Sequence, residues 1–199
     1  RIYMNYYNNF DNAYYQTALE EFKKARALGI NSPQFHRDYA MAFMGINNKE
    51  RAVQQLEMAI VDNGSVDDLL NIANLHKELG NYDQFVDFYN QVISMDNENV
   101  QAYGELGDVL IRQENYTQAA EELQTGVELN PDSLVINFQL GKAYYYTENY
   151  EQAEQYLTKV IELKQNYYRA HYYLGLLYEK QEDYQNALYY LKEATTYNP

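Results

Sequence analysis

Apolar side chains recur along this chain at the spacing of a helix. Tyr103, Leu106 and Leu110 lie three and four residues apart, and the same spacing returns in residues 119–127 after a short polar break. Residues spaced in this way share one face of an α-helix, whereas a strand would alternate every second residue. The pattern predicts two amphipathic helices joined by a short turn.

This pair of helices repeats every 34 residues. Six columns keep the same step: Tyr82, Tyr116, Tyr150 and Tyr184; Asn81, Asn115, Asn149 and Asp183; Ile72, Leu106, Leu140 and Leu174; Ala73, Gly107, Gly141 and Gly175; Phe85, Ala119, Ala153 and Ala187; Tyr89, Leu123, Leu157 and Leu191. A fixed period of this length indicates a stack of helical hairpins in which each repeat packs on its neighbours.

Two columns predict local structure at the turn and at the helix contact. Asn81, Asn115 and Asn149 suit the N-cap of the second helix, where a side-chain oxygen accepts a backbone N–H, and a Gln three residues later could complete a capping box. Glycine inside a helix costs up to about 1 kcal/mol relative to alanine. Its recurrence in one column therefore predicts a close approach between the two helices of each hairpin.

These columns resemble the tetratricopeptide repeat (TPR), whose signature places an aromatic residue, Leu, Gly and Tyr in the first helix and a small residue in the second. Tyr103, Leu106, Gly107 and Ala119 followed by Pro131 match it closely. The resemblance implies an all-α fold, a right-handed α-solenoid of about six TPR helix-turn-helix hairpins. The expected units are approximately 1–32, 33–65, 66–99, 100–133, 134–167 and 168–199, and the first helix of the first unit (near 3–10) fits the signature poorly.

Composition narrows the choice of partner. The 199 residues include 15 Lys and Arg against 29 Asp and Glu, a net charge of −14. So acidic a surface repels phosphate backbones and anionic lipids, which argues against nucleic acid and membrane partners. No apolar run approaches the roughly 18 residues that a spanning helix needs, so membrane insertion is not predicted. The many Asn, Gln and Tyr residues favour an AT-rich, bacterial genome, and a cytoplasmic location is slightly favoured.

The sequence offers no catalytic or metal-binding constellation. There is no cysteine, and the histidines His36, His76 and His171 fall on helical packing positions without the spacing of metal ligands. Adjacent acidic residues point about 100° apart on a helix and do not converge on a substrate. We predict no enzyme activity, no catalytic residue, no metal and no cofactor.

In the TPR family, the first helices of successive units line a concave surface that holds a protein or peptide. The corresponding positions of the last two units combine aromatic residues with cations: Phe138, Lys142, Tyr145, Tyr146, Arg169, Tyr172, Tyr173 and Lys180. Such a composition is enriched in binding hot spots. The hypothesis is that the rings cradle an extended or helical peptide and the cations pair with its acidic groups, although 24 tyrosines would place some rings here by composition alone.

One family-specific ligand is not expected. Chaperone-binding members hold two carboxylates with Lys, Asn and Arg at fixed places, and here Asn74 fills one place while Leu70 and Glu105 occupy two others. Three roles stay open: a scaffold that binds a peptide or protein, a structural segment of a larger enzyme or envelope-assembly protein, and self-association through an uncapped last helix. The start at Arg1 and the end at Pro199 suggest a fragment of a longer protein.

Overall fold

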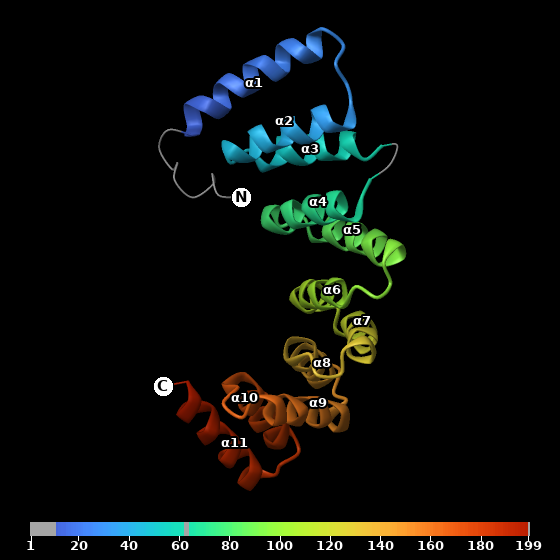
Figure 1. Ribbon diagram of the computed structural model, residues 1–199. Coiled ribbons are helices and arrows are strands. Elements are labelled where there is room, and N and C mark those ends of the chain that lie inside the picture. The colour runs from blue at the N-terminus through green and yellow to red at the C-terminus, as the bar shows by residue number, and fades with distance from the viewer. Residues whose placement is uncertain (1–10, 62–63, 199) are drawn as a thin grey trace. The chain divides into compact units, whose positions relative to one another are not determined.

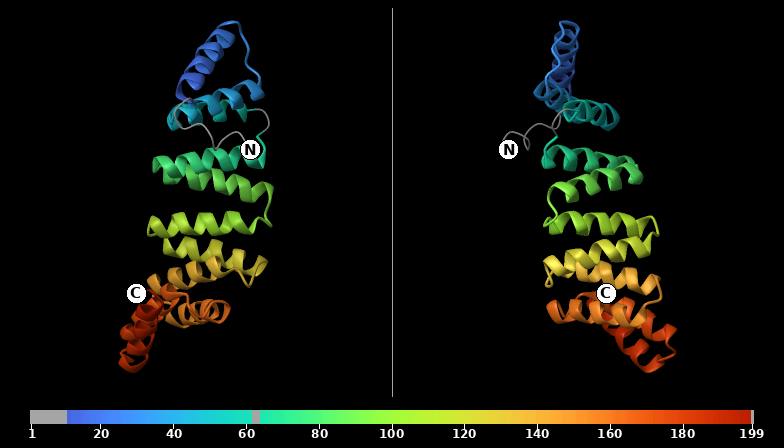
Figure 2. Two further views of the ribbon diagram at one scale, coloured as in Figure 1. Left: turned by 60° about the vertical axis from the view of Figure 1, so that its left-hand side comes forward. Right: turned by 90° about the vertical axis from the view of Figure 1, so that its right-hand side faces the viewer.

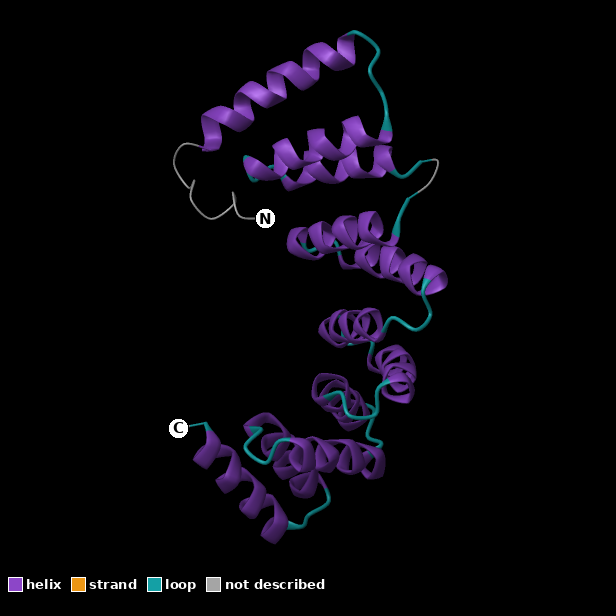
Figure 3. Ribbon diagram, viewed as in Figure 1, coloured by secondary structure: helices purple, strands orange, loops and turns teal. Residues whose placement is uncertain are grey.

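The computed structural model describes residues 11–61 and 64–198, so the helix expected near residues 3–10 lies outside the described residues. Within those ranges the regular structure is entirely helical (Figure 1; Figure 3). The helices are α1 (Asp11–Ala27), α2 (Pro33–Gly45), α3 (Lys49–Ala59), α4 (Val66–Leu79), α5 (Tyr82–Met95), α6 (Val100–Arg112), α7 (Tyr116–Leu129), α8 (Leu134–Tyr146), α9 (Tyr150–Leu163), α10 (Tyr168–Lys180) and α11 (Tyr184–Tyr197). The predicted all-α fold is confirmed.

Consecutive helices pair as hairpins, α2 with α3, α4 with α5, α6 with α7, α8 with α9 and α10 with α11. Figure 2 shows these paired helices side by side from two further directions. The chain forms two compact bodies, residues 1–95 (the N-terminal body) and residues 96–199 (the C-terminal body). The candidate site lies wholly in the second of these.

The turn inside each hairpin places one residue in the left-handed region. Gly80, Glu114, Glu148 and Glu182 have φ values of 77°, 63°, 61° and 62° and lie 34 residues apart. Around Glu148, the N–H of Asn149 donates to the carbonyl of Tyr144 at 2.9 Å and the N–H of Glu148 donates to that of Tyr145 at 3.2 Å. This pair of bonds is a Schellman motif, which satisfies helix-end carbonyls and requires positive φ.

The predicted side-chain caps after these turns are absent at Asn115 and Asn149. Asn115 and Asn149 do stand at the N-caps of α7 and α9, but neither side chain accepts a cap hydrogen bond. The amide of Asn149 instead donates to Thr147 Oγ1 at 2.9 Å. Asp183, in the same column but not among the predicted caps, does cap α11, because its carboxylate accepts the N–H of Asn186 at 3.1 Å. The capping expectation was therefore wrong for the two asparagines.

The glycine column marks close helix contacts, as predicted. A Cβ added at Gly141 would lie 2.8 Å from Leu157 Cγ, and one at Gly175 would lie 2.7 Å from Leu191 Cγ. Gly107 makes the same approach to Leu123. The atoms that meet each glycine belong to the leucine column of the second helix. The first helix of a repeat is thus held tightly to the second by its glycine face.

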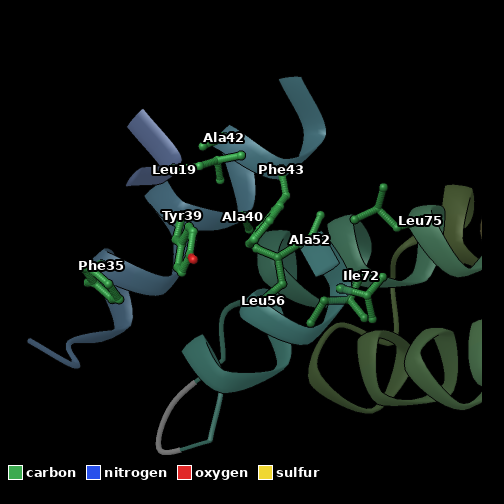
Figure 4. Packing of buried hydrophobic residues seen from close by; sticks show 11 residues of the cluster. Leu19, Phe35, Tyr39, Ala40, Ala42, Phe43, Ala52, Leu56, Ile72 and Leu75 are labelled. Carbon is green, nitrogen blue, oxygen red and sulfur yellow. The ribbon is translucent and has the colours of Figure 1, made fainter. Parts of the chain in front are cut away.

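Aromatic and aliphatic side chains fill the core of the N-terminal body. Phe22 of α1 stacks on Tyr39 of α2 with ring centroids 5.1 Å apart, and Tyr39 stacks on Phe43 at 4.7 Å. Figure 4 shows Phe43 beside Ala52 and Leu56 of α3. All three histidines of the chain are buried packing residues, in agreement with the sequence analysis.

One ion pair ties α2 to α4 within the N-terminal body. Arg37 donates twice to the Asp68 carboxylate, Nε to Oδ1 and Nη2 to Oδ2, each at 2.8 Å. Asp68 also accepts the N–H of Ser65 at 3.1 Å and completes a capping box at the start of α4. The Arg37 guanidinium, with the Ser65 contacts, lowers the pKa of Asp68 from its usual 3.8 to about 2, against the opposing effect of burial.

Candidate functional site

The candidate surface is built on α8 and α10, the first helices of two successive hairpins, which contact each other in the C-terminal body. Their glycine faces, at Gly141 and Gly175, pack on α9 and α11. Tyrosines on other faces of α8 and α10 are therefore left at the surface. Tyr146 and Tyr172 are 42% and 46% exposed, whereas Tyr145 and Tyr173 are half-buried.

Five tyrosine rings form a continuous row. Tyr116, the first residue of α7, stacks on Tyr146 with centroids 4.4 Å apart and an interplanar angle of 13°. Tyr146 meets Tyr173 edge-on at 6.2 Å, and Tyr173 meets Tyr172 edge-on at 5.7 Å. Tyr145 lies edge-on to Tyr173 at 5.6 Å and to Tyr146 at 5.3 Å. We call these five residues the tyrosine row.

A lysine lies over the middle of the tyrosine row. Lys142 Nζ is 5.9 Å from the ring centroid of Tyr146 and 6.0 Å from that of Tyr173. The hydroxyl oxygens of these two tyrosines are 3.4 Å apart. Ammonium groups within about 6 Å of an aromatic ring face are attracted by its quadrupole. The two rings therefore hold the ammonium in the corner between α8 and α10.

The phenols of Tyr173 and Tyr145 stay protonated at neutral pH. Burial, followed by the hydrogen bond with Tyr146, raises the pKa of Tyr173 well above its ordinary value. Burial is also the largest cause that raises the pKa of Tyr145, and the nearby Glu179 carboxylate adds to it. A neutral phenol both donates and accepts hydrogen bonds. The corner therefore offers hydroxyl donors as well as a cation.

Phe138 differs from the expectation that it would be exposed. Its side chain is only 8% exposed and packs in a core cluster with Leu157 and Leu174. The ring also lies edge-on to Tyr173 at 5.8 Å, so it supports the tyrosine row from below. It is buried because side chains of both α9 and α10 pack against α8 at this position.

The other two predicted cations have different surroundings from those of Lys142. The Arg169 guanidinium lies 5.8 Å from the ring centroid of Tyr168, and its Nε donates to the Tyr168 hydroxyl at 3.2 Å. Lys180 is exposed at the end of α10. Of the predicted cations, Lys142 is the one whose charged group lies over ring faces of the tyrosine row.

Tyr116 is the member of the row that the sequence analysis missed. It belongs to the second helix of the preceding hairpin, and the sequence analysis considered only first-helix positions. A signal was present, because Tyr116 belongs to the 34-residue tyrosine column. Its ring packs beside the end of the next first helix, which the column by itself does not reveal.

Local charge sets α8 and α10 apart from the acidic chain. Together they carry three cations, Lys142, Arg169 and Lys180, and one carboxylate, Glu179. The neighbouring α7 carries only carboxylates, at Glu121, Glu122 and Glu128. Across residues 11–61 and 64–198, no cluster of side chains has the composition of a metal site. In the same ranges, no helix has both the length and the apolar character needed to cross a membrane.

Sequence models of the tetratricopeptide repeat match residues 69–99, 98–166 and 138–199. Together these matches run from residue 69 to residue 199, about two thirds of the chain. The chain belongs to the tetratricopeptide repeat family. No curated protein is significantly similar to it in sequence.

Solved TPR structures agree with this assignment. The crystal structure of YrrB, described as a TPR protein with an unusual peptide-binding site, has a TM-score of 0.74 at 24% identity and covers 91% of this chain and 94% of YrrB. A crystal structure of MamA has a TM-score of 0.73 at 21% identity, with coverages of 79% and 93%. MamA from Desulfovibrio magneticus RS-1 (41-end) also has a TM-score of 0.73, at 20% identity, with coverages of 83% and 94%. At these identities the likeness establishes the TPR fold alone.

Proposed function

We propose that this TPR chain is a protein-interaction scaffold and that the tyrosine row on α8 and α10 binds a segment of a partner protein. The observation that carries the proposal is a partly exposed row of rings around one ammonium, held by ring-to-ring contacts rather than buried in the core. TPR arrays use extended surfaces of this kind for binding. The peptide-binding site named for YrrB supports the same role by analogy.

The energetics of tyrosine favour such a role. Each ring offers a large contact area and a polar hydroxyl, and its side chain has few rotatable bonds to freeze. Tyr146 and Tyr173 already contact each other through their hydroxyl groups at 3.4 Å. Because the rings are ordered before the partner arrives, less conformational entropy is lost on binding.

The proposal is tested by selection of short random peptides, displayed on phage, against the immobilised full chain. We expect enriched peptides whose affinity, measured by fluorescence anisotropy, falls at least tenfold in the Tyr145→Ala/Tyr172→Ala double variant, because truncation of hot-spot residues costs about 2 kcal/mol or more. Tyr184→Ala is the matched control, since Tyr184 is 67% exposed on α11. Selected peptides that bind the double variant as tightly as the wild type would refute the proposal.

A second candidate function, self-association, is favoured by one observation on α11. This helix exposes apolar side chains, including Leu188 at 55% and Tyr189 at 56%. Leu188 stands 34 residues after Glu154, a position that the next hairpin contacts through the Tyr178 hydroxyl at 2.6 Å. A second copy of the chain would cover this face in the same manner. Sedimentation equilibrium should then show a dimer that Leu188→Glu dissociates; a monomer at all concentrations would exclude it.

A further inference from the structure

We infer that the partner segment presents one internal Asp or Glu to Lys142, and that its carboxylate bonds the ammonium and the phenol pair of Tyr146 and Tyr173. This inference rests on the proposed function and names the chemistry of its partner. Apolar or aromatic residues would stand on both sides of the acidic residue and pack on the remaining rings of the row.

The ammonium group of Lys142 has hydrogen-bond donors that the chain does not use. An ammonium group has three donors, and here the surrounding groups are the π-faces of two rings, 5.9 and 6.0 Å away. Within the part of the chain that the structure describes, no ion pair involves this lysine, whereas Lys159 on the next helix pairs with Asp132 at 3.0 Å. A cation that is held in place without a counter-charge is a binding site for an anion.

The phenol pair of Tyr146 and Tyr173 supplies a further hydrogen-bond donor. With the hydroxyl oxygens of Tyr146 and Tyr173 3.4 Å apart, one hydroxyl donates to the other. The accepting hydroxyl keeps its own hydrogen and is free to donate it to a further group. A carboxylate accepts several hydrogen bonds, so it can bond the ammonium and this hydroxyl together.

The positive charge at the corner argues against a cationic partner residue. An aromatic corner alone would suit a lysine or a methylated ammonium. Here Lys142 already occupies the corner, and α8 and α10 together carry three cations against the single carboxylate of Glu179. A second cation in the corner would meet like charge.

The net charge of the whole chain limits how acidic the partner segment can be. The whole chain has a net charge of −14, which repels a run of acidic residues at long range. At physiological ionic strength that repulsion is screened beyond about 8 Å, so a single carboxylate in contact with Lys142 gains more than it loses. One acidic residue within an apolar or aromatic segment fits both conditions.

The extent of the tyrosine row favours an internal acidic residue of the partner over a C-terminal carboxylate. The row continues on both sides of the Lys142 corner, to Tyr116 beyond Tyr146 and to Tyr172 beyond Tyr173. A chain terminus seated at Lys142 would leave one of these two rings without a contact. A segment that passes through the corner covers both.

The experiment uses synthetic peptides from the phage selection with the full chain. Each peptide is compared with versions in which its acidic residue is replaced by the corresponding amide or by Lys, and with a version that ends at the acidic position. For the wild type we expect about tenfold tighter binding of the acidic peptide than of its amide version, because a hydrogen bond to a charged group is among the stronger ones. Lys142→Gln should remove this difference, and Lys142→Arg should keep it.

Lys164→Gln is the matched control, because Lys164 Nζ also lies 6.0 Å from a tyrosine ring centroid, that of Tyr167, but outside the row. It should leave the tenfold preference intact. Far-UV circular dichroism and thermal melting of each variant establish that it is folded before its affinity is compared.

The outcomes separate this inference from the proposed function. Peptides that need Tyr145 and Tyr172 but show no preference for Asp or Glu would overturn the inference and leave the proposed function standing. So would a preference that survives Lys142→Gln, or binding that requires a free C-terminal carboxylate. If no selected peptide depends on Tyr145 and Tyr172, both are wrong.

Discussion

Two glycines inside helices of the C-terminal body should respond to alanine with opposite signs. Gly104 lies in α6 and Gly141 lies in α8. Alanine at either site gains up to about 1 kcal/mol of helix propensity. At Gly104 the added methyl would meet Ile136 Cγ1 at 3.4 Å, an ordinary van der Waals contact. Gly104→Ala is therefore expected to stabilise the protein by about 0.5–1 kcal/mol.

At Gly141 the short contact distance makes the change to alanine destabilising. The methyl would lie 2.8 Å from Leu157 Cγ and 3.2 Å from the Leu157 backbone nitrogen. A branch-point carbon and a backbone atom cannot turn aside as a flexible side-chain end can, so α8 and α9 must move apart. Overpacking of this kind costs about 1–3 kcal/mol, which exceeds the gain in propensity. Gly141→Ala is expected to destabilise the protein by up to about 2 kcal/mol.

Urea denaturation followed by far-UV circular dichroism measures both changes. For a chain of this size, 1 kcal/mol corresponds to a shift of about 2–4 °C in melting temperature, so thermal scans give an independent reading. The double variant Gly141→Ala/Leu157→Ala should lose less stability than the two single changes added together, because the smaller side chain relieves the clash. Equal stabilisation by Gly104→Ala and Gly141→Ala would refute the packing argument.

Two further stability predictions follow from the ion pair and from the turns. Arg37→Gln should destabilise the N-terminal body at neutral pH, because the Asp68 carboxylate then loses its ion pair. Arg37 is the largest of the causes that, with the Ser65 contacts, lower the pKa of Asp68 from 3.8 to about 2. The deficit should therefore be full above pH 4 and shrink as pH falls toward 2. Urea titrations between pH 2 and 7 test this, and a deficit unchanged at pH 2 would contradict it. Glu148→Gly should raise stability by about 1 kcal/mol, because φ is 61° there and glycine has no Cβ to strain. The matched change Glu151→Gly, within α9, should lower stability by about the same amount in the same thermal scans; a fall in stability for Glu148→Gly would show that the turn does not strain its glutamate.

Much of the fold could be predicted because the features that define it are local or repeat. Helical spacing depends on residues three and four apart, and the 34-residue period reports the same hairpin several times. The glycine column predicted the close helix contacts correctly, since each repeat makes the same contact. The N-cap expectation at Asn149 failed because its amide had a competing partner, Thr147, whose rotamer no column reveals.

The candidate site depended more on tertiary structure. The sequence by itself determined which residues lie on the first helices of the last two hairpins, and so it brought Tyr145, Tyr146 and Tyr173 into one prediction. Only the packing of α9 and α10 against α8 decided that Phe138 is buried and that Lys142 lies between two rings. The packing of α7 against α8 likewise added Tyr116, from the second helix of the preceding hairpin, to the tyrosine row. Contacts between successive hairpins join residues about 30 positions apart, and the spacing within one helix carries no record of how its neighbour packs against it.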